Sequence, residues 1–327
     1  MIIPAYNAGR TIGRALEPLL RDPAAALEVI VVDDGSTDGT PELVEALALK
    51  DDRIRLVRQP KNSGTFHARV AGILAAITPQ VGFADADDWI DGAELLRLAG
   101  QARREEADIL IFGAWRTDPE GRERVRVAFP RHAVHDGDVL GKFARLEFET
   151  GLMWNKIYRR EIVEELVRRK VDRRLVLGED YIANVLCFAA AQRVVVVRDM
   201  PYHYLEMPGS QTAESHGARG FVDLYENFAD ALEIFESDGP RILEAVAELY
   251  RNQLLLGYCR VRNSGDLAPY RSRLEEALRR IIRIRPEFVN DFFPRDAPEG
   301  NGVSAALQSV RGSLRFLLSA LRRKFRL

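Results

Sequence analysis

Strand-like and helix-like segments alternate along the first third of the chain. β-branched and aliphatic residues gather in four short runs, and segments of helical periodicity lie between them. This alternation predicts a mostly parallel β-sheet with helices on both faces, because parallel strands need a long crossover connection that is usually a helix. The predicted strands are residues 28–34, 54–57, 81–84 and 109–112, and the predicted helices are residues 12–20, 42–49, 68–77 and 93–104.

The remainder of the chain has a different pattern. Residues 119–215 mix turns, an arginine-rich strand-like stretch at 122–129 and short helices, whereas the pattern from residue 216 onward is helical. We therefore predict three parts, namely residues 1–118, residues 119–215 as a second half of the same domain, and a C-terminal helical region of residues 216–327. The helices predicted in the last part are residues 221–235, 241–262 and 270–283.

Charge and cysteine content narrow the function classes. The 47 Lys and Arg nearly cancel the 49 Asp and Glu, so no overall field attracts nucleic acid, and we expect no nucleic-acid partner. The only cysteines are Cys187 and Cys259, which excludes a disulfide framework and fits a reducing compartment. No stretch reaches the roughly 18 apolar residues of a membrane span, and the N-terminus has no signal-peptide pattern. These features predict a cytoplasmic protein.

Two acidic clusters follow predicted strands, at the sheet edge where ligands of α/β proteins bind. Asp33 and Asp34 end the first long strand, although the Gly-Ser-Thr-Asp that follows them could be only a turn and a helix cap. Asp85, Asp87 and Asp88 follow a later strand. Closely packed carboxylates repel one another unless a cation or a proton intervenes. An Asp-x-Asp at this place therefore suits a Mg²⁺–diphosphate site, with an acidic turn as the alternative.

A third cluster, Glu179-Asp180, opens the apolar helical pattern of residues 182–191. The helix dipole favours acids in a first turn, which is a sufficient structural reason for both residues. The functional interpretation needs one of them to act as a general base toward a substrate hydroxyl.

Other familiar sites are absent from the sequence. It has no Gly-x-Gly-x-x-Gly after a strand and no Gly-Lys-Ser/Thr loop, which argues against dinucleotide oxidoreductases and P-loop NTPases. The five histidines have no zinc spacing. Phosphatases of the haloacid dehalogenase type carry Asp-x-Asp on their first strand, whereas here it follows the third run, at residues 81–84.

Taken in order, the clusters closely resemble the family 2 glycosyltransferases of GT-A fold. The resemblance is dense over about the first 115 residues and continues in two later stretches. It implies a Rossmann-like, mostly parallel α/β sheet flanked by helices, with the helical region as a C-terminal extension. The matching stretches are IIPAYN at residues 2–7, VVDDGSTDGT at 31–40, NSG at 62–64, AR at 68–69, DADD at 85–88, MWNKIYRR at 153–160 and GED at 178–180.

The resemblance also implies a role for each matched residue. Residues 1–118 would bind the nucleotide sugar and residues 119–215 the acceptor. Asp180 would be the catalytic base with Glu179 beside it, and Asp87, Asp85 and Asp88 would hold Mg²⁺ or Mn²⁺. The donor nucleotide would contact Pro4, Ala5, Tyr6, Asn7, Asp34, Asn62, Gly64, Arg69, Asp85 and Ala86, and the acceptor side would be formed by Trp154, Asn155 and Lys156.

The implied reaction is an inverting, metal-dependent transfer of a sugar from a nucleotide-diphosphate donor, UDP-sugar above all. The acceptor would be a hydroxyl of a glycan or of a lipid-linked molecule in bacterial surface polysaccharide synthesis. A sugar nucleotidyltransferase is one alternative, but it would show a Gly-rich loop with arginine where Pro4-Ala5-Tyr6-Asn7 stands. A catalytically silent nucleotide- or glycan-binding module is another, against which Asp87 and Asp180 count.

The chain departs from the family at residues 202–210. Many relatives carry arginines there that could contact the diphosphate, and this chain has none. His203 either substitutes for them or is a packed, hydrogen-bonded residue.

Residues 303–327 contain no acid and have the pattern of a basic amphipathic helix. Such a helix either lies in a membrane interface beside anionic lipid or docks on the domain or on a partner subunit. The first alternative would make the protein peripheral on the inner face of the cell membrane. The apolar face is formed by Leu307, Val310, Leu314, Leu317, Leu318, Leu321 and Phe325, flanked by Arg311, Arg315, Arg322 and Arg326.

We predict that the full chain binds vesicles containing anionic lipid and that a version ending at Gly302 does not. Vesicle sedimentation measures the difference, and added salt should weaken the binding because ions screen surface charge. Equal binding of the two versions would contradict the membrane interpretation and favour docking on protein.

Overall fold

The computed structural model describes residues 1–118, 122–148, 151–175, 178–206, 218–261 and 268–286. The chain divides into two compact units, Met1–Met207 and Pro208–Leu327. The boundary predicted between residues 215 and 216 lies in residues 207–217, outside the described residues. Both predicted halves of the sugar-transfer domain belong to the first unit.

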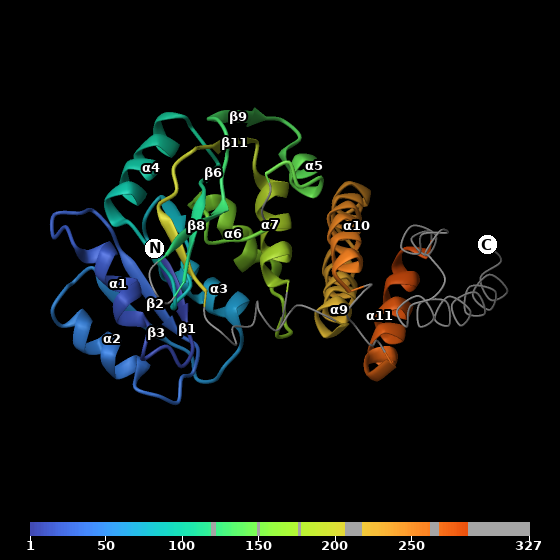
Figure 1. Cartoon of the computed structure of the whole chain (residues 1–327), viewed down its shortest axis with the longest axis horizontal. Helices are drawn as coiled ribbons and strands as arrows, with labels where there is room; N and C mark the ends of the chain where they lie inside the picture. The colour runs from blue at the N-terminus through green and yellow to red at the C-terminus, as the bar shows by residue number, and fades with distance from the viewer. Residues whose placement is uncertain (119–121, 149–150, 176–177, 207–217, 262–267, 287–327) are drawn as a thin grey trace. The chain divides into compact units, whose positions relative to one another are not determined.

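A parallel three-stranded sheet forms the N-terminal part of the first unit, as the alternating pattern predicts (Figure 1). All residues of its middle strand β2 are buried, which explains the unbroken apolar run in the sequence. The strands are β1 (Ile2–Ala5), β2 (Val29–Asp33) and β3 (Ile54–Arg58), in the order β1-β2-β3, and the helices between and after them are α1 (Ile12–Leu20), α2 (Thr40–Ala48) and α3 (Thr65–Ala75).

A second, mixed sheet continues the first one. A parallel bridge between Ile2 and Phe83 joins β1 to the residue after β4, and β10 runs antiparallel to both of its neighbours. The parallel character is therefore interrupted where β10 inserts. Its strands, in spatial order, are β4 (Gln80–Gly82), β10 (Lys156–Arg159), β6 (Ile109–Ile111), β11 (Arg193–Val196) and β9 (Ala133–Asp136).

Helices cover both faces of these sheets (Figure 1). Helix α1 contacts α2 and α4, whereas α3 contacts α6 and α7, so the two sets are separate layers. The helices not yet bounded are α4 (Gly92–Arg104), α5 (Val139–Ala144), α6 (Arg160–Arg169) and α7 (Glu179–Ala190).

A small third sheet lies beside the acidic residues 85–88. It includes the strand predicted at residues 122–129, which pairs with β7 as an antiparallel ribbon. Strand β12 pairs with β5 and β7 and brings residues 202–205 next to the acidic cluster. In spatial order the strands are β5 (Trp89–Ile90), β12 (Tyr202–Leu205), β7 (Ala114–Thr117) and β8 (Glu123–Val127).

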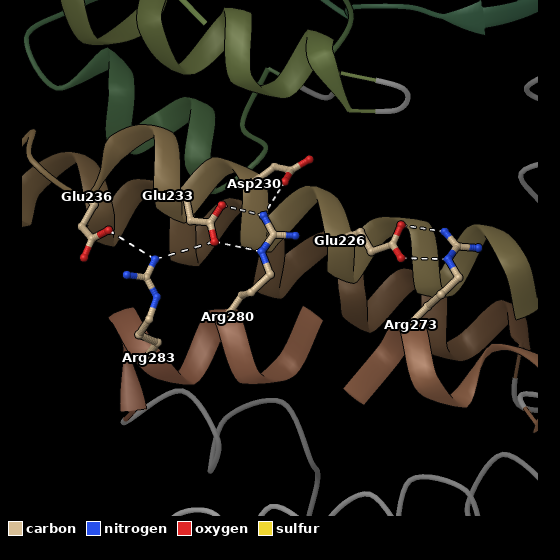
Figure 2. Close-up of polar contacts among 7 residues, drawn as sticks. All are labelled: Glu226, Asp230, Glu233, Glu236, Arg273, Arg280 and Arg283. Carbon is tan, nitrogen blue, oxygen red and sulfur yellow. Dashed lines mark hydrogen bonds and ion pairs between the residues drawn. The ribbon is translucent and has the colours of Figure 1, made fainter. Parts of the chain in front are cut away.

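The second unit is helical, as its pattern predicts. Helix α9 (Ala218–Phe235) packs against both α10 (Pro240–Val261) and α11 (Arg271–Ile284), and a short 3₁₀ turn η1 (Ala268–Tyr270) precedes α11. Figure 2 shows arginines of α11 paired with acids of α9. Arg273 pairs with Glu226, and Arg280 pairs with Glu233 at 2.7 Å, so both partners advance by two helical turns. This spacing sets the register of the two helices.

Among the described residues, no helix combines the length and the apolar character that crossing a membrane requires. The predicted amphipathic helix of residues 303–327 lies outside the described residues.

Helix α3 approaches β1 and β2 closely at Gly72. A Cβ placed there would collide with the side chain of Ile2 and would lie 3.2 Å from Cγ2 of Val32. In contrast, a Cβ at Gly13 of α1 would meet nothing within 4 Å.

We predict opposite effects of the same substitution at these two helical glycines. Gly13→Ala should stabilise the protein by about 0.5–1 kcal/mol, because alanine loses less backbone entropy in a helix. Gly72→Ala should destabilise it by roughly 1–3 kcal/mol despite the same gain, because the extra methyl overpacks the core. Thermal unfolding of the two variants and the wild type measures this, and a Gly72→Ala protein at least as stable as wild type would contradict the packing argument.

Candidate active site

Asp34 lies at the carboxyl end of β2 and is buried. Its two carboxylate oxygens accept hydrogen bonds from the backbone N–H groups of Ser63 and Gly64, at 2.8 and 2.7 Å. Gly64 has φ of 94°, a conformation that glycine adopts without strain. Asp34 therefore shapes the loop that leads into α3. Oδ1 of Asn62 in the same loop is buried and has no hydrogen-bond partner among the described residues.

The loops after β1 and β2 are tied together through Asn7. Its backbone N–H donates to Oγ of Ser36 at 2.9 Å, and its Oδ1 accepts from the backbone N–H of Thr37 at 2.8 Å. The neighbouring Tyr6 is 48% exposed, whereas Ala5 is buried and Pro4 is partly buried. Among the residues predicted to bind the base at this loop, Tyr6 thus presents the accessible surface, and Asn7 holds the loop.

Arg69 of α3 brings two of the predicted acids together. Its guanidinium is buried, donates a hydrogen bond to Oδ1 of Asp180, lies 3.8 Å from Oδ1 of Asp85 and stands over the ring of Phe83. Burial alone would lower the pKa of Arg69, but Asp180, Glu179 and Asp85 raise it above its ordinary value. The guanidinium therefore stays charged and links the end of β4 to the start of α7.

The three acids after β4 have different environments. Asp88 is buried, and its oxygens accept from the hydroxyl of Tyr202 at 2.8 Å and from the backbone N–H of Leu205 at 2.7 Å. Asp87 is exposed, and Asp85 with its neighbour Ala86 is partly buried. Asp88 thus attaches the cluster to β12, and Asp85 and Asp87 are the more accessible carboxylates.

Crowding and burial affect how these acids ionise. Burial raises the pKa of Asp85 above its usual range, and the charges of Asp180 and Asp87 raise it further against the opposing effect of Arg69. Burial likewise raises the pKa of Asp88. No group of three or more His, Cys, Asp or Glu side chains in the described part of the chain is arranged to hold a metal ion by itself.

Asp180 and Glu179 form the first turn of α7, after Gly178 with φ of 73°. Oδ2 of Asp180 accepts a hydrogen bond from the backbone N–H of Met153 at 3.1 Å. With Arg69 on the other oxygen, the carboxylate is held from both sides. Burial and the neighbouring Asp180 raise the pKa of Glu179.

The residues predicted to form the acceptor side are all buried. Trp154 stacks on Tyr202, with ring centroids 4.3 Å apart. Nδ2 of Asn155 donates to the carbonyl of Phe112 at 3.1 Å, and Nζ of Lys156 donates to Oδ1 of Asn155 at 2.9 Å. Burial lowers the pKa of Lys156 to about 7. These three side chains support the segment before β10 from inside, which a polar sequence stretch does not reveal.

His203 is packed, the second of the two alternatives left by the sequence. Its ring stacks on Trp89 with centroids 5.0 Å apart, and its Nδ1 lies 2.8 Å from Oε1 of Glu123.

Sequence reasoning missed two groups at the site. The guanidinium of Arg14 in α1 donates to the backbone carbonyl of Asp87 at 2.9 Å and stands over the Trp89 ring. The backbone N–H of Met153 orients Asp180. A backbone donor has no sequence signal, and Arg14 lies 73 residues from its partner.

Comparison with known proteins places the chain in a family. The model of "Glycosyl transferase family 2" matches residues 1–167. The glycosyltransferase EpsJ of Bacillus subtilis is 31% identical over 65% of this chain and 62% of its own length. The succinoglycan biosynthesis protein ExoO of Rhizobium meliloti is 32% identical over 64% of this chain and 61% of its own. The match thus spans about three fifths of each curated relative.

Solved structures of TarS from S. aureus share the fold. The complex of TarS 1–349 with UDP superposes with a TM-score of 0.68 at 21% identity, covering 99% of this chain and 90% of that one. The complex with UDP-GlcNAc has a TM-score of 0.67 at 21% identity, covering 88% and 82%. The predicted GT-A fold is confirmed, and the chain belongs to glycosyl transferase family 2.

Proposed function

We propose that this protein is an inverting, metal-dependent glycosyltransferase. It transfers a sugar from a UDP-sugar to a hydroxyl of a polysaccharide or lipid-linked glycan. The observation that carries the proposal is the position of Arg69 between Asp85 and Asp180. It joins the acid predicted to bind the donor and the acid predicted to act as base in one site. The relatives named for succinoglycan biosynthesis and the TarS complexes with UDP and UDP-GlcNAc support the same reaction class.

The donor side has groups suited to a nucleotide. The exposed ring of Tyr6 can stack on a base, and the unpartnered Oδ1 of Asn62 can accept a hydrogen bond from a ligand. Asp34 would act on the nucleotide mainly through the loop that it shapes.

A divalent cation fits the acids after β4. Asp85 and Asp87 supply hard oxygen ligands, and Mg²⁺ commonly binds to one or two carboxylates plus substrate phosphates. The crowding that raises the pKa of Asp85 would be relieved by a positive ion. Asp88, whose two oxygens already accept hydrogen bonds, would hold Asp87 in place. When bound, Mg²⁺ or Mn²⁺ neutralises charge on the leaving diphosphate.

Asp180 suits the role of base. The acceptor hydroxyl oxygen forms a bond to the anomeric carbon, the bond from that carbon to the diphosphate oxygen breaks, and the hydroxyl proton passes to Asp180. Attack on the face opposite the leaving UDP inverts the anomeric centre. Arg69 and the N–H of Met153 fix the carboxylate during this step.

The first test measures UDP release from a panel of UDP-sugars with and without Mn²⁺. We expect wild type to release UDP only with the metal, and Asp87→Asn to lose roughly 100-fold or more, because a bound cation contributes several kcal/mol. Asp52→Asn, at an exposed acid beside β3, is the matched control. Pyrophosphate release would indicate a nucleotidyltransferase, and binding of UDP without turnover a silent module. Full turnover of Asp87→Asn in the presence of chelator would refute the metal role.

The second test concerns Asp180→Asn. Asparagine keeps the oxygen that accepts from Met153 but cannot take a proton, so we expect turnover to fall about 100- to 10,000-fold. UDP affinity and melting temperature should stay near wild type, because the donor contacts lie elsewhere. Glu179→Gln should cost less. Near-normal turnover of Asp180→Asn would assign the base to Glu179 or to another carboxylate.

A further inference from the structure

The segment of residues 151–155 has no helix or strand, yet side chains hold it at consecutive positions. Nδ2 of Asn184 donates to the carbonyl of Gly151 at 2.7 Å, and Nζ of Lys156 donates to the carbonyl of Leu152. The next N–H, that of Met153, donates to Asp180. Helix α7 therefore contacts the segment at two places one turn apart, through Asp180 and Asn184.

Lys156 occupies the centre of this arrangement. Its ammonium group is fully buried and also donates to Asn155, which in turn donates to the carbonyl of Phe112 after β6. A chain of hydrogen bonds thus runs from the central sheet through Lys156 and Leu152 to the residue that orients Asp180. A buried lysine is costly, and burial lowers its pKa to about 7. A hydrophobic side chain of the same length would fill the space at less cost if packing were its only role.

We propose that Lys156 is a positioning residue for the reaction, fixing the Leu152 carbonyl so that the N–H of Met153 holds Asp180 toward the acceptor hydroxyl. This inference rests on the proposed function, because it assumes that Asp180 is the base. It replaces the contact with acceptor that the family resemblance implies for Lys156.

Kinetics of Lys156→Met test the proposal, since methionine has nearly the same length and no donor. We expect kcat to fall about 10- to 100-fold, the effect of misplacing a reacting group, with the Kd of UDP within about twofold of wild type. In the Asp180→Asn background the same change should cost nothing further, because residues that act as a unit are not additive. Lys50→Met, at an exposed lysine after α2, is the control.

Three kinetic results would overturn the proposal. They are unchanged kcat, a parallel loss of UDP affinity and turnover, and an equal further loss in the Asp180→Asn background. If Lys156→Met does not fold, Lys156→Gln takes its place. Its amide can still donate to a carbonyl, so we expect kcat to fall less than about 10-fold, and again no further loss with Asp180→Asn.

Hydrogen exchange separates this proposal from the proposed function. The Met153 amide should exchange about 5- to 10-fold faster in Lys156→Met than in wild type or Lys50→Met, as expected for one weakened hydrogen bond. Unchanged exchange would refute the tether even in an active enzyme. A wild-type protein that transfers no sugar would refute the proposed function, while the exchange result still decides whether Lys156 holds the segment.

Discussion

The buried guanidinium of Arg69 is the interaction on which the site depends. A charge withdrawn from water costs several kcal/mol unless opposite charges and hydrogen bonds compensate it. Asp180 and Asp85 supply that compensation from two segments that are 95 residues apart in number. Removing either acid would leave the guanidinium short of countercharge. The end of β4, helix α3 and the start of α7 are therefore held together by electrostatics as well as by apolar packing.

The acids of the site divide into those that build it and those that face solvent. Asp34 and Asp88 are buried and accept hydrogen bonds on both oxygens, so each shapes a loop. Asp87 is exposed, and Asp85 is partly buried. A carboxylate saturated by backbone and hydroxyl donors is a poor candidate for further chemistry, whereas an exposed one beside another acid gains from a cation. The same residue type thus has two physical roles within a few ångströms of sequence neighbours.

The polar interior beneath residues 151–155 illustrates why a site needs buried hydrogen bonds. An irregular segment has backbone groups without ladder partners, and each would be costly if left unsatisfied inside the protein. Asn184 and Lys156 satisfy the carbonyls of Gly151 and Leu152. Tyr158 donates to Asn184 at 2.9 Å, so the supporting side chains are themselves held. Such a network specifies one conformation where an apolar core would allow several.

The sequence by itself determined the strand–helix alternation, the parallel N-terminal sheet and the helical second unit, because apolar periodicity reports burial within one element. It also identified the acidic clusters, since each ends a strand or begins a helix. Only the tertiary structure decided which acid is buried and which is exposed, that β10 runs antiparallel between β4 and β6, and that Trp154, Asn155 and Lys156 point inward. These depend on contacts such as Arg69 with Asp180, 111 residues apart, and a local pattern carries no information on partners at that separation.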